Sequence, residues 1–69
     1  MRTWTKATAR AQAAREIKVT REGNGYGVTS YNPVTGVAWT LEGFRKRATA
    51  NIARNAAREH RADGLINLG

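Results

Sequence analysis

The sequence of 69 residues contains no cysteine, one proline and one histidine. The absence of cysteine excludes disulfide bonds and thiolate metal sites. A domain of this length buries only about 60% of the surface that its unfolded chain exposes. Stability then has to come from strong local structure or from self-association. We therefore predict one small basic domain, residues 1–69, for which a homodimer is one route to stability.

Acidic residues are scarce, since five Asp and Glu stand against 12 Lys and Arg, which gives a formal net charge of +7. Nine of the basic residues are arginines. The planar guanidinium of arginine pairs with two oxygens of a phosphate, which lysine cannot do. This balance indicates nucleic acid, an anionic membrane surface or an acidic protein as the partner. The alternative interpretation is a GC-rich coding sequence, which favours arginine and alanine without any function.

Long apolar runs are missing as well. No segment approaches the roughly 20 apolar residues of a membrane-spanning helix, and the N-terminus lacks the apolar region of a signal peptide. The basic segment 3–15 offers only Trp4 and alanines for insertion into a lipid surface, so we expect no membrane partner. Together with the absence of cysteine, these features favour the cytoplasm.

Candidates for catalysis are few, because His60 is the only histidine and Ser30 the only serine. With a single histidine and a single serine, the sequence does not support a Ser-His-Asp catalytic set. Asp63 lies one helical turn after His60, but Arg58 and Arg61 flank the pair and would oppose a cation. We therefore expect no enzyme activity, no metal and no cofactor.

The residue pattern predicts a helix, three strands and a second helix. Residues 3–15 are rich in alanine and follow two possible capping residues, Thr3 and Thr5. Residues 17–22 and 26–32 alternate apolar and polar residues around the hairpin signal Asn24-Gly25. A turn over 32–36, in which Gly36 takes a positive φ, leads to a third strand at 37–41.

The second helix is expected from about 41–43 to Ala62, with Gly64 as its C′ residue. The predicted fold class is α+β, in the order α-β-β-β-α. It is a three-stranded antiparallel meander covered by an amphipathic C-terminal helix, with an N-terminal helix before it. The predicted core consists of Trp4, Ala11, Ile17, Val19, Val28, Val37, Trp39, Leu41, Phe44, Ala48, Ile52 and Ala56.

An arginine stripe is the most informative pattern on the second helix. Its members follow at i, i+4, i+7, i+11 and i+14, which confines them to an arc of about 80°. They are Arg47, Asn51, Arg54, Arg58 and Arg61. The opposite side carries small and apolar residues, so we expect the stripe to face solvent and to follow a polyanion.

Three further basic or polar groups are candidate contacts. The cluster Arg45-Lys46-Arg47 opens the second helix, where unpaired N–H groups favour an anion and cations destabilise the helix. The alternative is a solvated run of charge. Lys18 and Tyr31 share the outward sheet face with threonines, as in β-sheet readers of the DNA major groove, although threonine also simply favours strands. A possible second basic face consists of Arg2, Lys6 and Arg10.

Two family resemblances add expectations. The order α-β-β-β-α with a basic cluster before the last helix is similar to double-stranded RNA-binding domains, which implies that Arg45, Lys46 and Arg47 contact phosphates. The run from Val37 to Ile52, with its strand, Glu-Gly-Phe-Arg segment and spaced alanines, looks like the YegP-like family of small β-β-β-α domains. That resemblance implies dimers or tandem repeats and no settled biochemical activity.

The sequence thus predicts a small nucleic-acid-binding protein that grips the phosphate backbone through the arginine stripe, with DNA favoured over RNA. The alternative is a small interaction protein, of the kind that phages or mobile elements encode, that binds an acidic host protein without catalysis. For that alternative the apolar residues Leu65, Ile66 and Leu68 would contact the partner or a second subunit.

Overall fold

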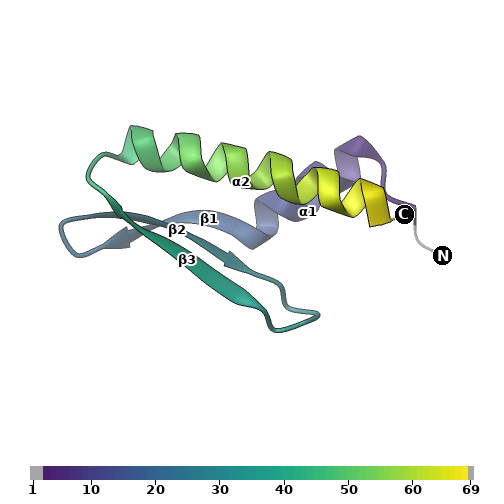
Figure 1. Ribbon diagram of the computed structural model, residues 1–69, viewed down its shortest axis with the longest axis horizontal. Coiled ribbons are helices and arrows are strands. Elements are labelled where there is room, and N and C mark those ends of the chain that lie inside the picture. The colour runs from purple at the N-terminus through teal and green to yellow at the C-terminus, as the bar shows by residue number, and fades with distance from the viewer. Residues whose placement is uncertain (1–2, 69) are drawn as a thin grey trace.

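The computed structural model describes residues 3–68, of which the side chain of Leu68 is not described, and it confirms the order α-β-β-β-α. The elements are α1 (Lys6–Glu16), β1 (Ile17–Glu22), β2 (Gly25–Tyr31), β3 (Ala38–Phe44) and α2 (Arg47–Leu68) (Figure 1). The strands form one antiparallel sheet in the order β1-β2-β3, so the fold is a mixed α+β domain.

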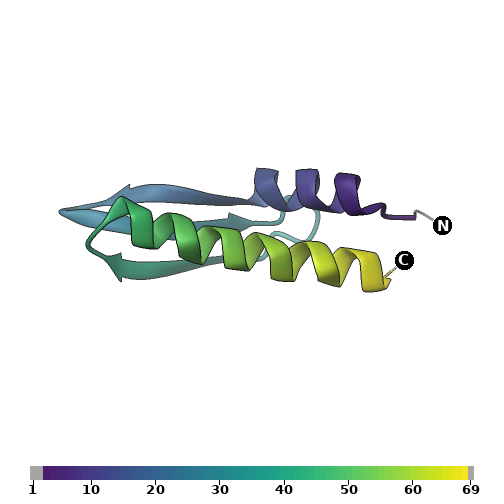
Figure 2. The ribbon, with the colours of Figure 1, turned by 90° about the horizontal axis from the view of Figure 1, so that it is seen from above.

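The long helix α2 connects the two halves of the molecule. Its first half lies over the sheet and its second half runs beside α1 (Figures 1 and 2). α1 passes into β1 without a loop, because Glu16 ends the helix and Ile17 begins the strand. This continuity places α1 beyond the end of the sheet and gives the molecule extents of 44 × 23 × 13 Å. One face of the sheet is left without a helix (Figure 1).

The sheet register fixes which side chains share a face. Ile17 pairs with Ser30 and Ser30 with Trp39, whereas Lys18 pairs with Thr29 and Thr29 with Thr40. Because successive residues of a strand point to opposite faces, the first set lies on the side of α2 and the second on the uncovered side. The predicted alternation of the strands is therefore confirmed.

Two small apolar clusters hold the fold together. The first lies between α1 and α2 and contains Ala9, Ala13, Ala62 and Leu65, with Trp4 packed against it. The second lies between the sheet and α2 and contains Ile17, Val28 and Ala50. Among the described residues, Ile17 and Val28 are the largest side chains that are fully buried. Alanine dominates because it lets the two helices, and α2 and the sheet, approach closely.

Helix α2 is rotated relative to the predicted orientation. It turns Ala50, Ala53 and Ala57 toward the sheet, so the predicted core residue Ile52 is 70% exposed. Ala11, Ala48 and Ala56 are exposed as well, which makes their prediction as core residues wrong. The helical pattern of α2 indicated the wrong inner face because it assigned every arginine to solvent. The aliphatic stem of an arginine can cover apolar surface while its guanidinium binds acceptors.

The predicted core residues of the third strand, expected over 37–41, are also more exposed than expected, and β3 itself begins at Ala38. Val37 is 62%, Leu41 45% and Trp39 39% exposed. Leu41 and Trp39 do lie on the side of α2, as their pairing with Val28 and Ser30 shows. Their side chains stay partly exposed because α2 packs mainly on β1 and β2 and leaves most of β3 uncovered.

Several element boundaries differ from the prediction. The first hairpin turns at Gly23-Asn24, with Gly25 already in β2, and the positive φ of Gly23 replaces the expected turn at Asn24-Gly25. β3 continues to Phe44, because Phe44 pairs with Tyr26 after a bulge. α2 therefore begins at Arg47, beyond the predicted 41–43.

The C-terminal boundary of α2 moves for a different reason. The helix passes through Gly64, the predicted C′ residue, and ends at Leu68. Leu65 is 5% exposed and packs against α1. That burial stabilises the extra turn by more than the roughly 1 kcal/mol that a glycine costs inside a helix.

Other local predictions are confirmed. Thr5 caps α1, since its hydroxyl accepts a hydrogen bond from the Thr8 amide at 3.2 Å while the Thr8 hydroxyl accepts one from the Thr5 amide at 3.0 Å. Gly36 takes the expected positive φ of 75° in the turn between β2 and β3. Gly43, with φ of 94°, forms the bulge that interrupts the pairing of β2 and β3.

A matched pair of valine variants tests where the core lies. Val28→Ala removes two methyl groups from a fully buried position, so we expect a loss of about 2–3 kcal/mol in the free energy of unfolding. The same substitution at Val34, which is 90% exposed, should cost less than about 0.5 kcal/mol. Urea unfolding followed by circular dichroism measures both. Equal losses would contradict the assigned core.

Candidate nucleic-acid interface

Arg58, a member of the predicted stripe, binds the junction between α1 and β1. Its Nε donates a hydrogen bond to the carbonyl of Ile17 at 2.8 Å, and its Nη2 donates to the carbonyl of Ala14 at 3.2 Å. Carbonyls in the last turn of a helix lack partners within the helix. The guanidinium satisfies one of them together with the first carbonyl of β1, so Arg58 joins three elements.

Arg61, one turn further along α2, forms an ion pair with Glu16. Its Nε donates to Oε1 of Glu16 at 2.8 Å and its Nη2 donates to Oε2 at 3.3 Å. The side chain of Glu16 is only 3% exposed, and that of Arg61 is 30% exposed. Gln12 donates a further hydrogen bond to Oε2 of Glu16 at 2.9 Å. The carboxylate at the end of α1 is therefore buried but fully paired.

The environment of this pair shifts the pKa of Glu16. Burial alone would raise the pKa of the carboxyl, but the hydrogen bonds from Arg61 and Gln12 and the charge of Arg61 outweigh burial, so the pKa is lowered. The pKa of Arg58 is lowered by burial and by the charge of Arg54. Arginine nevertheless stays protonated at neutral pH.

The predicted arginine stripe is therefore divided by the fold. Arg58 and Arg61 make contacts within the chain, while Arg54 donates through Nε and Nη2 to Oδ1 of its neighbour Asn55 at 3.2 and 3.1 Å. Asn51 is half-buried and Arg47 is exposed at the start of α2. The stripe does not form one solvent-facing track, because its last two members, Arg58 and Arg61, face the junction of α1 and β1.

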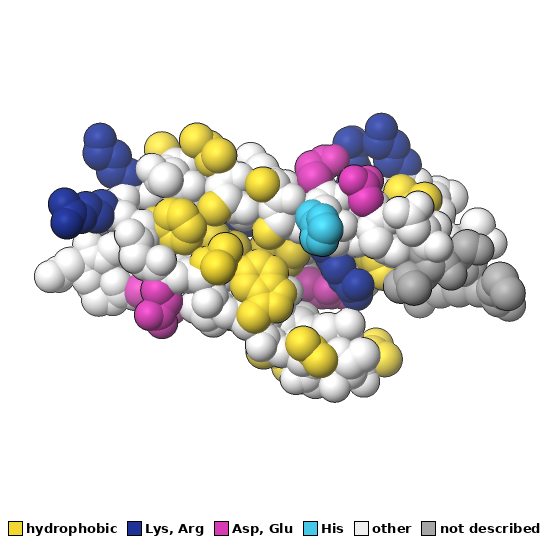
Figure 3. Space-filling model, viewed as in Figure 1, with side chains coloured by type: hydrophobic (Ala, Val, Ile, Leu, Met, Phe, Trp, Pro, Cys, Tyr) yellow, Lys and Arg dark blue, Asp and Glu magenta, His cyan; other side chains and the backbone are white. Residues whose placement is uncertain are grey.

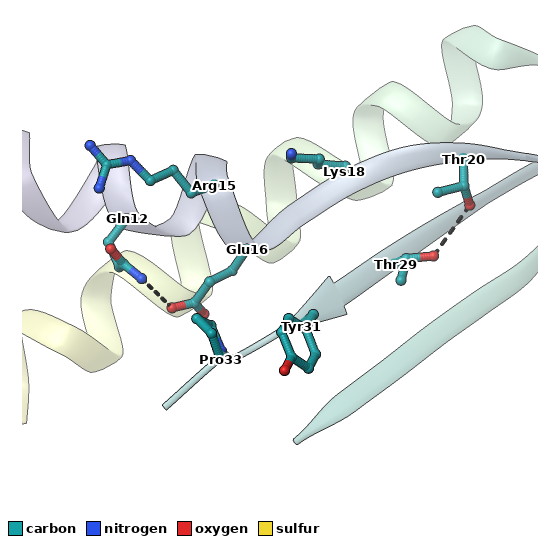
Figure 4. Close-up of a pocket in the computed structure, with 8 residues that line it drawn as sticks. All are labelled: Gln12, Arg15, Glu16, Lys18, Thr20, Thr29, Tyr31 and Pro33. Atoms are coloured by element: carbon teal, nitrogen blue, oxygen red, sulfur yellow. Dashed lines mark hydrogen bonds between the residues drawn. The ribbon is translucent and has the colours of Figure 1, made fainter. Parts of the chain in front are cut away.

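A second group of candidate residues lies on the uncovered face of the sheet. Lys18 and Tyr31 lie at the edge of a hollow of about 450 Å³, as do Thr20 and Thr29, whose hydroxyls are 3.2 Å apart (Figure 4). The lining is completed by three residues in the last turns of α1 and one residue after β2. They are Gln12, Arg15, Glu16 and Pro33. The sequence predicted Lys18 and Tyr31 here.

Arg15, like Arg21, is a functional candidate that the sequence pattern did not indicate. It belongs to α1, yet it lines the same hollow as Lys18 because α1 continues directly into β1 (Figure 4). The available signal was the absence of any turn residue between Arg15 and Lys18 in the sequence. Both side chains are exposed, and neither forms an ion pair among the described residues.

The third group lies at the other end of the molecule. Arg45 and Lys46 are exposed in the connection between β3 and α2, just before Arg47. Arg21 of β1 lines a shallow hollow together with Arg47 and Tyr26, so four basic residues share this end. The first turn of α2 holds no acidic residue. Cations therefore gather where the positive end of the helix dipole also lies, an arrangement that a bound anion would stabilise.

The other predicted contacts are placed less favourably. Lys6 and Arg10 are exposed on α1, but Arg10 pairs with Glu59 at 3.2 Å, and Arg2 lies outside the described residues. Leu65 is buried against α1 and Ile66 is 37% exposed. The side chain of Leu68 lies outside the described part, so its predicted role as a contact has no structural outcome.

Neither a cluster of metal ligands nor a helix suited to a membrane is found in residues 3–68. No three His, Cys, Asp or Glu side chains of this part of the chain come together as a metal site, and His60 is exposed. No helix in the same part is long and apolar enough to cross a membrane. Compared with models of known protein families, with curated proteins and with solved structures, the chain matches none of them.

Removing the partner of Glu16 should destabilise the fold strongly. Arg61→Ala leaves a buried carboxylate with only Gln12 as a partner, and we expect a loss of about 3 kcal/mol in the free energy of unfolding. Arg10→Ala is the matched control, because its ion pair with Glu59 is exposed on both sides and such pairs contribute little. Thermal unfolding of both variants measures the contrast, and similar melting temperatures would contradict it.

The lowered pKa of Glu16 also predicts how stability depends on pH. Its contribution is complete above the pKa in the unfolded chain, about 4.3, and is lost as the pH falls through the lower pKa of the folded state. The difference in melting temperature between the wild type and Glu16→Gln should therefore be constant near neutral pH. It should shrink from about pH 5 downward. A difference that grows with acidity would contradict the direction of the shift.

Proposed function

We propose that this protein binds nucleic acid, with double-stranded DNA favoured, through the uncovered face of its sheet and the basic residues at both ends of that face. The observation that carries this proposal is where the unpaired cations lie. Among the described residues, the basic side chains without an ion pair or side-chain hydrogen bond include Arg15 and Lys18 beside the hollow of the uncovered face and Arg21, Arg45, Lys46 and Arg47 around the start of α2.

The contrast with the paired arginines supports the proposal. Arg58 and Arg61 serve the fold, so their presence needs no ligand. The cations of the sheet face and of the start of α2 have no such partner, and they add to a net charge of +7. A surface of this kind attracts a polyanion and releases counterions when phosphates replace them.

The shape of the uncovered face favours DNA over RNA. The ribbon of β1 and β2, which carries Lys18 and Tyr31, has the two-stranded form that the major groove of B-DNA, about 12 Å wide, admits. The deep and narrow major groove of A-form RNA does not admit such a sheet. Thr20, Thr29 and Thr40 supply short hydroxyl groups on this face, and Tyr31 supplies an aromatic ring that is 52% exposed.

The two kinds of contact have different roles in this proposal. The basic residues at the start of α2 would bind phosphates and set the position of the protein on the duplex. Lys18 and Tyr31 would lie toward the groove, where contacts with base edges become possible. Arg15 lines the same hollow of about 450 Å³ as Lys18 and Tyr31, so a phosphate bound there would meet two cations (Figure 4).

The alternative, an interaction protein without catalysis, has less support from the apolar C-terminal segment on which it was based. It depends on an apolar C-terminal segment that is free to bind a host protein. Leu65 instead closes the cluster between α1 and α2. A truncation before Leu65 would therefore remove part of the fold, so loss of partner binding in such a variant would not identify a contact.

The proposal predicts a specific change in salt dependence. With about five phosphates neutralised, the logarithm of the association constant for duplex DNA should fall with the logarithm of salt concentration at a slope of about −4 to −5. The triple variant Arg45→Ala, Lys46→Ala, Arg47→Ala should reduce the magnitude of that slope by about 3. Fluorescence anisotropy with a labelled duplex measures both.

The control for this measurement is Arg54→Ala, because Arg54 is also on α2 but is bound to Asn55 away from the proposed face. It should leave the slope unchanged. A wild-type affinity that hardly varies with salt would contradict the proposed function. Equal slopes for the triple variant and the wild type would contradict the role of the basic residues at the start of α2.

A further inference from the structure

A second surface of the molecule has no role in the proposed function. Trp39 and Leu41 lie on the side of β3 that faces α2, and Val37 directly precedes this strand; the three are 39%, 45% and 62% exposed. We name these three residues the β3 patch. Figure 3 shows hydrophobic side chains gathered in a band between α2 and β3, with lysine and arginine side chains mostly toward the two ends of this view.

The edge of the sheet beside this patch is open as well. β3 is an outer strand of the sheet, and each of its residues except Phe44 is exposed. Its regular part, Ala38–Leu41, contains no charged residue and no proline. Natural proteins usually protect such edges with charges, proline or bulges, because an open edge pairs with another strand. The opposite edge, β1, carries charges along its length in Lys18, Arg21 and Glu22, whereas β3 carries a charge and a bulge only at its end, in Glu42 and Gly43.

From this combination we propose that β3 is the contact between two copies of this chain, which pair through their β3 edges around a two-fold axis. An antiparallel edge is complementary to its own copy, so a two-fold contact satisfies both strands at once. A second copy is also the partner that brings its own β3 patch, and it places apolar residues against apolar residues.

The bulge fixes where the two strands can pair. Regular pairing has to end before Gly43, because the strand is interrupted there. Side chains that face each other across an antiparallel pair share one face of the sheet. One register that meets both conditions places Thr40 opposite Thr40 of the second copy on the uncovered face. It then places Trp39 opposite the second copy's Leu41 on the face of α2.

Surface area and charge favour the same place. A stable interface takes about 800 Å² from each partner, which is about a sixth of the 5096 Å² surface of this chain. In the proposed dimer, the β3 patch and the open edge would form the apolar part of this interface. Two copies that each carry a charge of +7 repel. Contact at Ala38–Leu41 keeps that repulsion low, since this segment is uncharged.

The small core adds a reason for association. The two fully buried large side chains, Ile17 and Val28, come from β1 and β2, whereas the larger Trp39 stays partly open. In the paired arrangement, Trp39 and Leu41 of both copies would lie on the inner face of the joined sheet, between the two α2 helices. The dimer would thereby form a third apolar cluster and one sheet of six strands.

The absence of cysteine makes a direct test possible, because any disulfide in a single-cysteine variant joins two chains. Directly opposed residues of antiparallel strands have Cα atoms about 4.5–5.5 Å apart, which is within the range that a disulfide needs. Thr40→Cys should therefore form a covalent dimer under mild oxidation. Lys18→Cys is the matched control, since it lies on the same face at the other edge of the sheet, and it should crosslink at least tenfold more slowly.

A second measurement does not depend on crosslinking. Light scattering of the wild-type protein over a range of concentrations should show the mass rising from 7.6 kDa toward twice that value. Leu41→Lys should lower the association constant at least tenfold, whereas Val34→Lys, at an exposed position outside β3, should not change it. Circular dichroism checks that both variants fold.

Three outcomes would overturn the proposal. The first is a wild-type protein that stays monomeric at the highest concentration. The second is a dimer that Leu41→Lys leaves intact, which would place the contact elsewhere. The third is equal crosslinking of Thr40→Cys and Lys18→Cys. None of these measurements includes nucleic acid, so they are independent of the proposed function.

Discussion

The hydrogen bonds from α2 to the junction of α1 and β1 determine the shape of this molecule. At this junction a helix becomes a strand between two consecutive residues, Glu16 and Ile17. The change leaves helical carbonyls without partners and a carboxylate inside the fold. Arg58 and Arg61 resolve both problems from the same side of α2. Because no loop separates α1 from β1, this contact determines how α1 lies relative to the sheet.

The same contact explains why the apolar clusters are so small. α2 has to lie close enough for its guanidinium groups to reach the backbone of Ala14 and Ile17. Alanine at positions 9, 13, 50 and 62 permits that approach. Larger side chains would hold the helix away. The cost is a narrow core, since α2 then covers β1 and β2 and leaves the inner face of β3 open.

The order and type of the elements could be predicted because they depend on local signals. The Thr5 cap, the alternation in β1 and the glycine at 36 each act within a few residues. The orientation of α2 could not be predicted, because it depends on contacts between residues more than forty positions apart. A helical pattern assigns arginine to solvent. Only the fold reveals that Arg58 and Arg61 have acceptors inside it.

In the candidate site, too, local patterns predicted some residues while others depend on the fold. Lys18 and Tyr31 were predicted from strand alternation, and the exposed cluster at the start of α2 from its sequence alone. Arg15 was missed because it belongs to a different element. The interruption of the stripe at Arg58 and Arg61 was missed because Glu16 is a single acidic residue with no pattern around it.

The position of α2 also has a consequence for how the chain folds during synthesis. Both apolar clusters take residues from α2, Ala50 in one and Ala62 and Leu65 in the other. α2 is the last of the described elements, so neither cluster is complete before its residues from α2 have left the ribosome. Helix α1 and the sheet leave the ribosome without the helix that covers them. The chain therefore completes its fold in one late step, when α2 docks along its whole length.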